Sequence, residues 1–123
     1  MIAIDTSSLR RFLAGETGDD TDSVAELLTH RQLVLPPVVV TEILSEPRLQ
    51  RTTIAAITKI PVLEILEGYW VRAGELRARV IAAGNKAKVA DALIAQSCID
   101  HRARLLTNDR DFRHFLRWGL VLA

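Results

Sequence analysis

Two aspartates, Asp5 and Asp109, each follow a segment that is expected to be a buried strand. Asp5 follows the apolar run 1–4, which has the pattern of a short buried strand. Asp109 lies just after 104–107, a second expected strand. Open parallel sheets bind ligands at the carboxyl ends of their strands, so both acids would face such a site. Either acid, taken alone, could equally begin a loop or cap a helix.

Asp91 is more informative, because it lies at the start of an expected helix over residues 88–102. Ile94, Ala95, Cys98 and Ile99 follow it at intervals that put all of these side chains on one helix face. That face is apolar, so a carboxylate at its head must be neutral, paired or bound to a metal. The simpler alternatives are a structural ion pair and a first-turn acid favoured by the helix dipole.

Glu42 is the weakest candidate by itself, since a solvated glutamate at the edge of an apolar helix stripe would show the same pattern. Together with Asp5, Asp91 and Asp109 it suggests one acidic pocket. Crowded carboxylates raise each other's pKa values, and a divalent cation relieves this repulsion. Ligands that are all oxygen suit Mg²⁺ or Mn²⁺, whereas the usual zinc ligands are missing here.

The elements that must position these acids are short apolar strands alternating with helices. Strands are expected over 1–4, 33–35, 61–66, 104–107 and 120–122. Helices are expected over 7–14, 21–30, 38–46, 48–59, 67–83, 88–102 and 111–117. This alternation predicts an α/β fold, a three-layer α/β/α sandwich with a central, mostly parallel sheet of four to five strands.

Two of these helices carry specific expectations. The segment 38–46 has a β-branched run that favours a strand, but the prolines before it favour a helix start, and helix is the prediction. The helix over 67–83 should turn Val71, Leu76 and Val80 inward. Tyr69 and Trp70 should pack in the core or in an interface.

Length and composition narrow the class of protein. The 123 residues suit one domain spanning 1–123, and 49% hydrophobic with 25% charged residues exclude a disordered chain. A net charge of +1 excludes a polybasic protein that binds nucleic acid over its whole surface. The single cysteine, the lack of a membrane-length apolar run and the lack of a basic leader predict a cytoplasmic protein without membrane contact.

The sequence motifs that several other reactions require are missing. The sequence has no phosphate-binding loop, no dinucleotide-binding glycine pattern and no nucleophile elbow, which argues against nucleotide-driven and serine-hydrolase reactions. A phospho-receiver domain would require a pair of acids after the first strand and a lysine near the end of the chain. Here Asp5 stands alone, and no lysine follows Lys88.

Four short segments, in this order, carry a family resemblance: Ile4–Ser7, Val40–Ile43, Val89–Ala95 and Leu106–Phe112. Together they resemble the PIN-domain ribonucleases, and most closely the VapC-type toxins of prokaryotic toxin–antitoxin modules. Each segment alone is a weak pattern, but all four in order, in a chain of this length, are a strong one.

The resemblance implies a site and a reaction. Asp5, Glu42 and Asp91 would be the core metal ligands, and Asp109 would supply a fourth catalytic acid. Asp111 would contact the metal through water or only cap the following helix. The reaction would be the hydrolysis of RNA phosphodiesters with Mg²⁺ or Mn²⁺, which leaves a 5′-phosphate and a 3′-hydroxyl.

Neighbouring side chains would support this chemistry. The hydroxyls that would hold the carboxylates or metal-bound waters are those of Thr6, Ser7 and Thr107. The cations that would contact RNA phosphates are Arg10, Arg11, Lys86, Lys88 and Arg110. Ordinary solvated charge is the alternative for each of these cations.

The resemblance also implies partners: an RNA substrate, a VapB-like antitoxin and a second copy in a homodimer. An antitoxin tail would lay apolar side chains into a groove between helices and place an Arg or Lys at the acids. The apolar residues available for it on the first two helices are Leu9, Phe12, Leu13, Leu27 and Leu28. The alternative function is a catalytically silent PIN-fold module that only binds RNA or a protein.

Overall fold

A parallel three-stranded sheet forms the centre of the computed structural model, which describes residues 1–123. Strand β1 (Ile2–Ile4) lies between β2 (Leu33–Val34) and β3 (Arg104–Leu106). A parallel sheet needs cover on both faces. Ala3 of β1 and Leu105 of β3 are accordingly fully buried.

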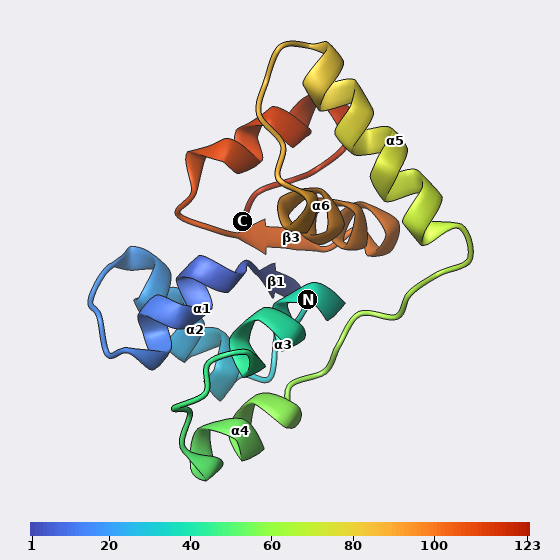
Figure 1. Cartoon of the computed structure of the whole chain (residues 1–123). Helices are drawn as coiled ribbons and strands as arrows, with labels where there is room; N and C mark the ends of the chain where they lie inside the picture. The colour runs from blue at the N-terminus through green and yellow to red at the C-terminus, as the bar shows by residue number, and fades with distance from the viewer.

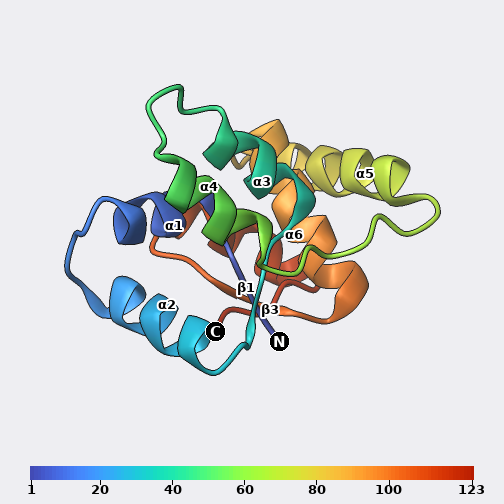
Figure 2. The ribbon, with the colours of Figure 1, turned by 90° about the horizontal axis from the view of Figure 1, so that it is seen from below.

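Helices cover this sheet on both sides. Figure 1 shows α1 to α4 in one half of the molecule and α5, α6 and the 3₁₀ helix η1 in the other, and Figure 2 shows β1 and β3 between these halves. This arrangement confirms the predicted α/β class. The helices are α1 (Thr6–Leu13), α2 (Asp19–Thr29), α3 (Pro37–Leu44), α4 (Arg51–Thr58), α5 (Tyr69–Ala82), α6 (Val89–His101) and η1 (Arg110–Trp118).

Two expected strands are reduced to single bridges, so the sheet has three strands rather than four to five. In the segment 61–66, only Val62 pairs, with Leu35 of the segment after β2. In the segment 120–122, only Leu122 pairs, with Leu105. Pro61 has no amide hydrogen to extend the first ladder, and residues 64–66 are exposed as the chain leaves the sheet for α5.

The ambiguous segment after β2 is helical, as predicted, and forms α3. Pro37 is its first residue, a position where the missing amide hydrogen has no partner to lose. Val39 and Ile43 are one turn apart and buried, so α3 packs its β-branched residues into the core. Packing on one helix face therefore overrides the strand propensity of the valine run.

Helix α5 buries Leu76 and Val80, as expected, but the expectation for Val71 is wrong. The buried stripe of α5 passes through Ala73, Leu76 and Val80. Val71 precedes Ala73 by two residues, roughly 200° round the helix, and its side chain is 65% exposed. Tyr69 is buried and donates to the carbonyl of Leu93, at 2.7 Å.

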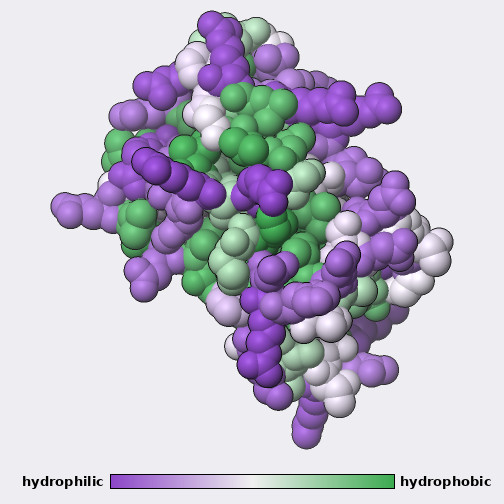
Figure 3. Space-filling view, turned by 180° about the vertical axis from the view of Figure 1, so that it is seen from behind, coloured by the Kyte–Doolittle hydropathy of each residue, from purple (hydrophilic) through white to green (hydrophobic).

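Several large apolar side chains remain at the surface, and one stretch supplies five of them: Val62, Ile65, Leu66, Trp70 and Val71. Figure 3 shows apolar residues gathered in the middle of the face opposite to that of Figure 1, with hydrophilic residues around them. No helix is both long enough and apolar enough to cross a membrane.

The apolar residues of the first two helices divide between core and surface. Leu9 is 1% exposed and belongs to the core. The expectation that it is available to a partner is therefore wrong. Phe12, Leu13, Leu27 and Leu28 are only partly buried against that core.

Candidate active site

Four acids from separate parts of the chain line one cavity of about 160 Å³, called the acid cavity below. Asp5 follows β1 and Asp109 comes shortly after β3, so the parallel strands deliver both to one edge of the sheet. Glu42 reaches the cavity from α3 and Asp91 from the first turn of α6. The structure thus brings together the four acids that the sequence singled out.

Asp5 is the most buried of these acids, at 2% exposure. Ser7 Oγ and Thr107 Oγ1 each donate to its Oδ2 at 2.8 Å, and the Ser8 amide donates to Oδ1 at 3.0 Å. Asp5 therefore caps α1, which is the structural role considered as the alternative in the sequence analysis. No salt bridge reaches it, so its carboxyl group is bound by hydroxyl and amide donors alone.

Glu42 is fixed by α1 rather than solvated at a helix edge. Thr6 Oγ1 donates to Glu42 Oε1 at 2.6 Å, and the side chain of Arg10 donates to the Glu42 carbonyl at 3.3 Å. Both contacts tie α1 to α3 next to the cavity. With Ser7 and Thr107 on Asp5, all three predicted hydroxyl residues donate to a carboxylate of the cavity.

Asp109 caps η1 and is held by the segment that follows β3. Its amide donates to Thr107 Oγ1 at 3.0 Å, and its Oδ1 accepts the Asp111 amide at 2.9 Å. Asp111 itself lies outside the acid cavity. It lines an adjoining groove of about 340 Å³, called the basic groove below, together with Arg77, Asn85, Lys86, Lys88 and Asp91.

Asp91 is the acid with the most perturbed titration. Its pKa is raised to about 6, mainly by burial and to a smaller extent by the charges of Asp109, Asp5 and Asp111, while Lys88 opposes the shift. Asp91 forms no salt bridge, so the structural ion pair considered above is absent. Its apolar neighbours on α6, among them Ile94 and Cys98, are buried as expected.

The chemistry of the lining fits a hard divalent cation. Four carboxylates and two hydroxyls line the acid cavity beside Arg10, Lys88 and two apolar residues, and the lining contains no thiol or imidazole. No group of three or more His, Cys, Asp or Glu side chains is close enough to hold one ion together. Mg²⁺ usually keeps several waters and binds through one or two carboxylates, so this open arrangement suits such an ion better than a closed structural site.

The five cations that were predicted to contact RNA phosphates lie at different places in the structure. Arg10 and Lys88 line the acid cavity, and Lys86 lines the basic groove. Arg110 is exposed at the start of η1 and lines neither of them. Arg77 was not singled out by the sequence, because its place here depends on the packing of α5 against α6.

Arg11 is occupied by its own loop. Its Nε lies 3.0 Å from Asp20 Oδ2, a second nitrogen lies 3.6 Å from Glu16, and a third contact reaches the Thr17 carbonyl at 3.2 Å. The hydrogen bond from Arg11 lowers the pKa of Asp20 below its ordinary value. Arg11 does not line the acid cavity.

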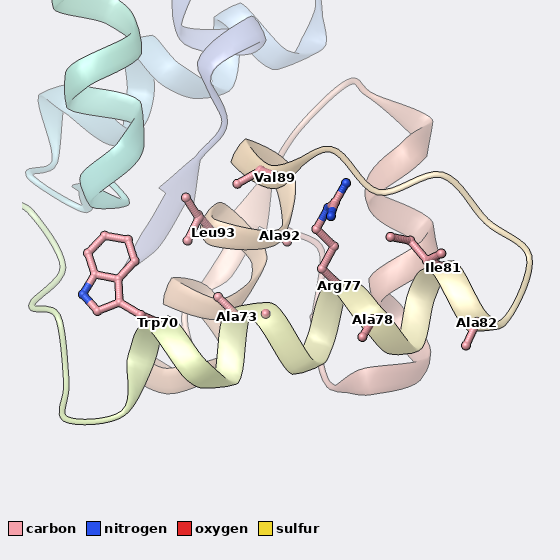
Figure 4. Close-up of a pocket in the computed structure, with 10 residues that line it drawn as sticks. Trp70, Ala73, Arg77, Ala78, Ile81, Ala82, Val89, Ala92 and Leu93 are labelled. Atoms are coloured by element: carbon pink, nitrogen blue, oxygen red, sulfur yellow. The ribbon is translucent and has the colours of Figure 1, made fainter.

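A groove of about 660 Å³ between α5 and α6 is larger than the acid cavity. Figure 4 shows Trp70 at one end of it and Arg77 reaching from α5 towards the segment that leads into α6. Arg77 is the only charged residue of its lining. The lining of this groove contains no acid, base or nucleophile, whereas the acid cavity contains four acids.

Comparison with known proteins identifies the family and the fold. The PIN domain family model matches residues 2–116. Among solved structures, a chain of the crystal structure of VapBC2 from Rickettsia felis, bound to a DNA fragment from their promoter, superposes with a TM-score of 0.75. That match covers 100% of this chain and 98% of the other, at 19% sequence identity, and therefore shows a shared fold.

No curated protein sequence matches the chain. The family match alone spans nearly its whole length and includes all four acids of the cavity. It confirms the fold family expected from the four sequence segments, and the chain belongs to the PIN domain family.

Proposed function

We propose that this protein is a metal-dependent endoribonuclease that hydrolyses RNA phosphodiester bonds, and that it is the toxin of a type II, VapBC-like toxin–antitoxin module. The observation that carries the proposal is the convergence of Asp5, Glu42, Asp91 and Asp109 on one cavity. Membership of the PIN domain family and the likeness to a VapBC2 chain support it at the level of the family.

The cavity acids are the residues that would hold Mg²⁺ or Mn²⁺, the cofactors we assign to it. When bound, such an ion lowers the pKa of a water molecule and stabilises negative charge on the phosphate oxygens. Asp91 is the cavity acid whose pKa is raised, to about 6, so its ionised form is the one that a bound cation would stabilise most. Asp111 would add negative charge from the basic groove.

The other residues of the site would orient these acids and the substrate. Thr6 keeps Glu42 turned towards the cavity, and Ser7 and Thr107 keep Asp5 in one rotamer. Arg10 and Lys88, on the cavity wall, would bind the oxygens of the phosphate that is cleaved. We leave Arg11 out of this role, since its guanidinium is already bound.

An antitoxin resembling VapB is the partner we propose for the face next to the site. A groove of about 310 Å³, lined by Leu13, Ile43 and Leu49 among others, shares Arg10 with the acid cavity. A peptide in this groove would end at the acids, where a basic residue of the peptide would be attracted.

We also propose a homodimer and a cytoplasmic location. The exposed apolar stretch that contains Ile65, Leu66, Trp70 and Val71 offers a surface for a second copy. The cytoplasm is the compartment that holds the RNA on which such a toxin acts.

The test is an RNA cleavage assay with purified protein. We expect cleavage in Mg²⁺ or Mn²⁺, products with a 5′-phosphate, and no cleavage after EDTA is added. Cleavage that survives complete chelation would contradict the metal-dependent reaction. Binding of RNA without cleavage under all of these conditions would favour the silent PIN-fold module instead.

A further inference from the structure

The basic groove adjoins the acid cavity. Lys88 and Asp91 line both, so the two cavities lie side by side. The groove leads away from the acids along one face of α5 and the segment 83–88 that joins α5 to α6. A polymer whose reacting group lay in the acid cavity would extend beyond it over a neighbouring surface such as this groove.

Three cations line this groove, and none of them has a carboxylate partner. The salt bridges of the structure use Arg11 and Arg72, whereas Arg77, Lys86 and Lys88 form none. The acids of the groove, Asp91 and Asp111, lie in the same depression but not within salt-bridge distance of them. Three cations against two acids therefore leave the groove with a small excess of positive charge beside the acidic centre.

The groove is also held in shape before any ligand arrives. Arg77 Nε donates to the Ala87 carbonyl at 2.8 Å, which leaves its other N–H groups without a partner in the chain. On the other side, His114 Nδ1 of η1 donates to the Lys86 carbonyl at 3.2 Å. The segment that carries Lys86 and Lys88 is thus fastened to α5 and to η1, so little ordering is required on binding.

We propose that the basic groove binds the backbone phosphates of the RNA next to the bond that is cleaved, with Arg77 as a phosphate-binding residue beside Lys86. A guanidinium with free N–H groups binds phosphate oxygens in a fixed geometry, and the two lysines add mobile charge. This inference rests on the proposed function and deepens it, because it assigns one side of the site to the flanking nucleotides.

The experiment measures binding, not cleavage, of a labelled single-stranded oligoribonucleotide. Fluorescence anisotropy in Mg²⁺ is followed over a range of NaCl concentrations, with Asp5→Asn protein so that the RNA stays intact. Arg77→Gln and Lys86→Gln are introduced singly into this protein. The matched control is Arg51→Gln, since Arg51 is exposed, forms no salt bridge and belongs to α4, which Figure 1 shows in the opposite half of the molecule from α5.

Each groove variant should weaken binding roughly 3- to 10-fold and lower the slope of log K against log salt by about 0.7, the value for one phosphate contact to a single strand. The control should change neither quantity. Groove variants that bind like the control would overturn the proposal. Lys86 makes no side-chain hydrogen bond, so its variant remains informative if Arg77→Gln disturbs the fold.

Two further measurements separate this inference from the proposed function. If the unaltered protein cleaves RNA but the groove variants bind RNA with unchanged affinity, the proposed role of the groove is wrong and the proposed function stands. Groove-dependent binding without any metal-dependent cleavage would overturn the proposed nuclease and keep the groove. If a poly-glutamate peptide loses affinity in the groove variants while RNA does not, the groove belongs to an acidic peptide and the proposal fails.

Discussion

Thr107 donates a hydrogen bond of 2.8 Å to Asp5, although the two residues are 102 positions apart in the chain. The same hydroxyl oxygen accepts the amide of Asp109 at 3.0 Å. One threonine at the end of β3 therefore connects two acids of the cavity and fixes the carboxyl ends of β1 and β3 relative to each other. We regard it as the residue that sets their separation.

Replacing Thr107 by valine should lower both activity and stability. The change keeps the shape but leaves the buried Asp5 carboxylate with one fewer donor and the Asp109 amide without its acceptor. We expect a loss of about 1–2 kcal/mol in the free energy of unfolding and a roughly tenfold lower cleavage rate. Urea unfolding and single-turnover kinetics measure the two effects.

The control for this change is Thr52→Val, because Thr52 is exposed on α4 and makes no side-chain hydrogen bond. Equal results for the two valine variants would show that the Thr107 hydroxyl has no special role.

Asp91→Asn should stabilise the metal-free protein at neutral pH. The folded pKa of Asp91 is raised to about 6, so its ionisation destabilises the fold as pH rises from about 4 to about 6. A shift of this size corresponds to roughly 2–3 kcal/mol above pH 6, which the amide would regain. Thermal melts in EDTA should show a higher midpoint for the variant at pH 7 and converging midpoints near pH 4.

Addition of Mn²⁺ reverses this comparison, since a cation that binds only the folded protein stabilises it. The midpoint of the unaltered protein should rise more than that of Asp91→Asn. Identical responses of the two proteins to Mn²⁺ would remove Asp91 from the proposed ligands.

Arg10 and Arg11 are neighbours in sequence but should have separable effects. Arg10→Gln removes a cation from the wall of the acid cavity and should weaken RNA cleavage with little change in melting temperature. Arg11→Gln removes the partner of Asp20 and should lower the melting temperature by a few degrees while cleavage is retained. The opposite pattern would mean that the assignment of the two arginines is wrong.

The fold was largely predictable because its elements have strong local signals. The buried runs around Ile4 and Leu105 and the apolar face of α6 depend on periodicity alone. The extent of pairing at Val62 and Leu122 could not be predicted, because a bridge and a strand have the same short apolar sequence. The outward turn of Val71 depends on which face of α5 meets α6, which is a tertiary property.

The candidate site was predictable for a different reason. Asp5 and Asp109 follow strands, and Asp91 begins an apolar helix face, so residue type and position were sufficient to find them. Glu42 had only a weak signal of its own in the sequence, since its contact with Thr6 is what distinguishes it from a solvated residue. Arg77 had no signal in the sequence, because it reaches the site through its hydrogen bond with Ala87.

Leu13→Asp should weaken the binding of a VapB-like antitoxin and leave RNA cleavage unchanged. Leu13 lines the apolar groove that shares Arg10 with the acid cavity, and a carboxylate there would have to be desolvated by the bound peptide. Co-purification with the antitoxin of the same operon, followed by a titration of the free proteins, measures the loss. Ile54→Asp, on the exposed side of α4, is the control.

A single-turnover cleavage assay in Mn²⁺ that compares the unaltered protein with Asp5→Asn tests the central proposal most directly. Asn keeps the size of the side chain and one acceptor for Ser7 or Thr107, but it lacks the negative charge that would hold the ion. We predict that the unaltered protein cleaves RNA and that the variant, folded by its melting curve, does so roughly 100-fold more slowly or worse. Equal rates for the two proteins, or equal rates with and without EDTA, would contradict the proposal.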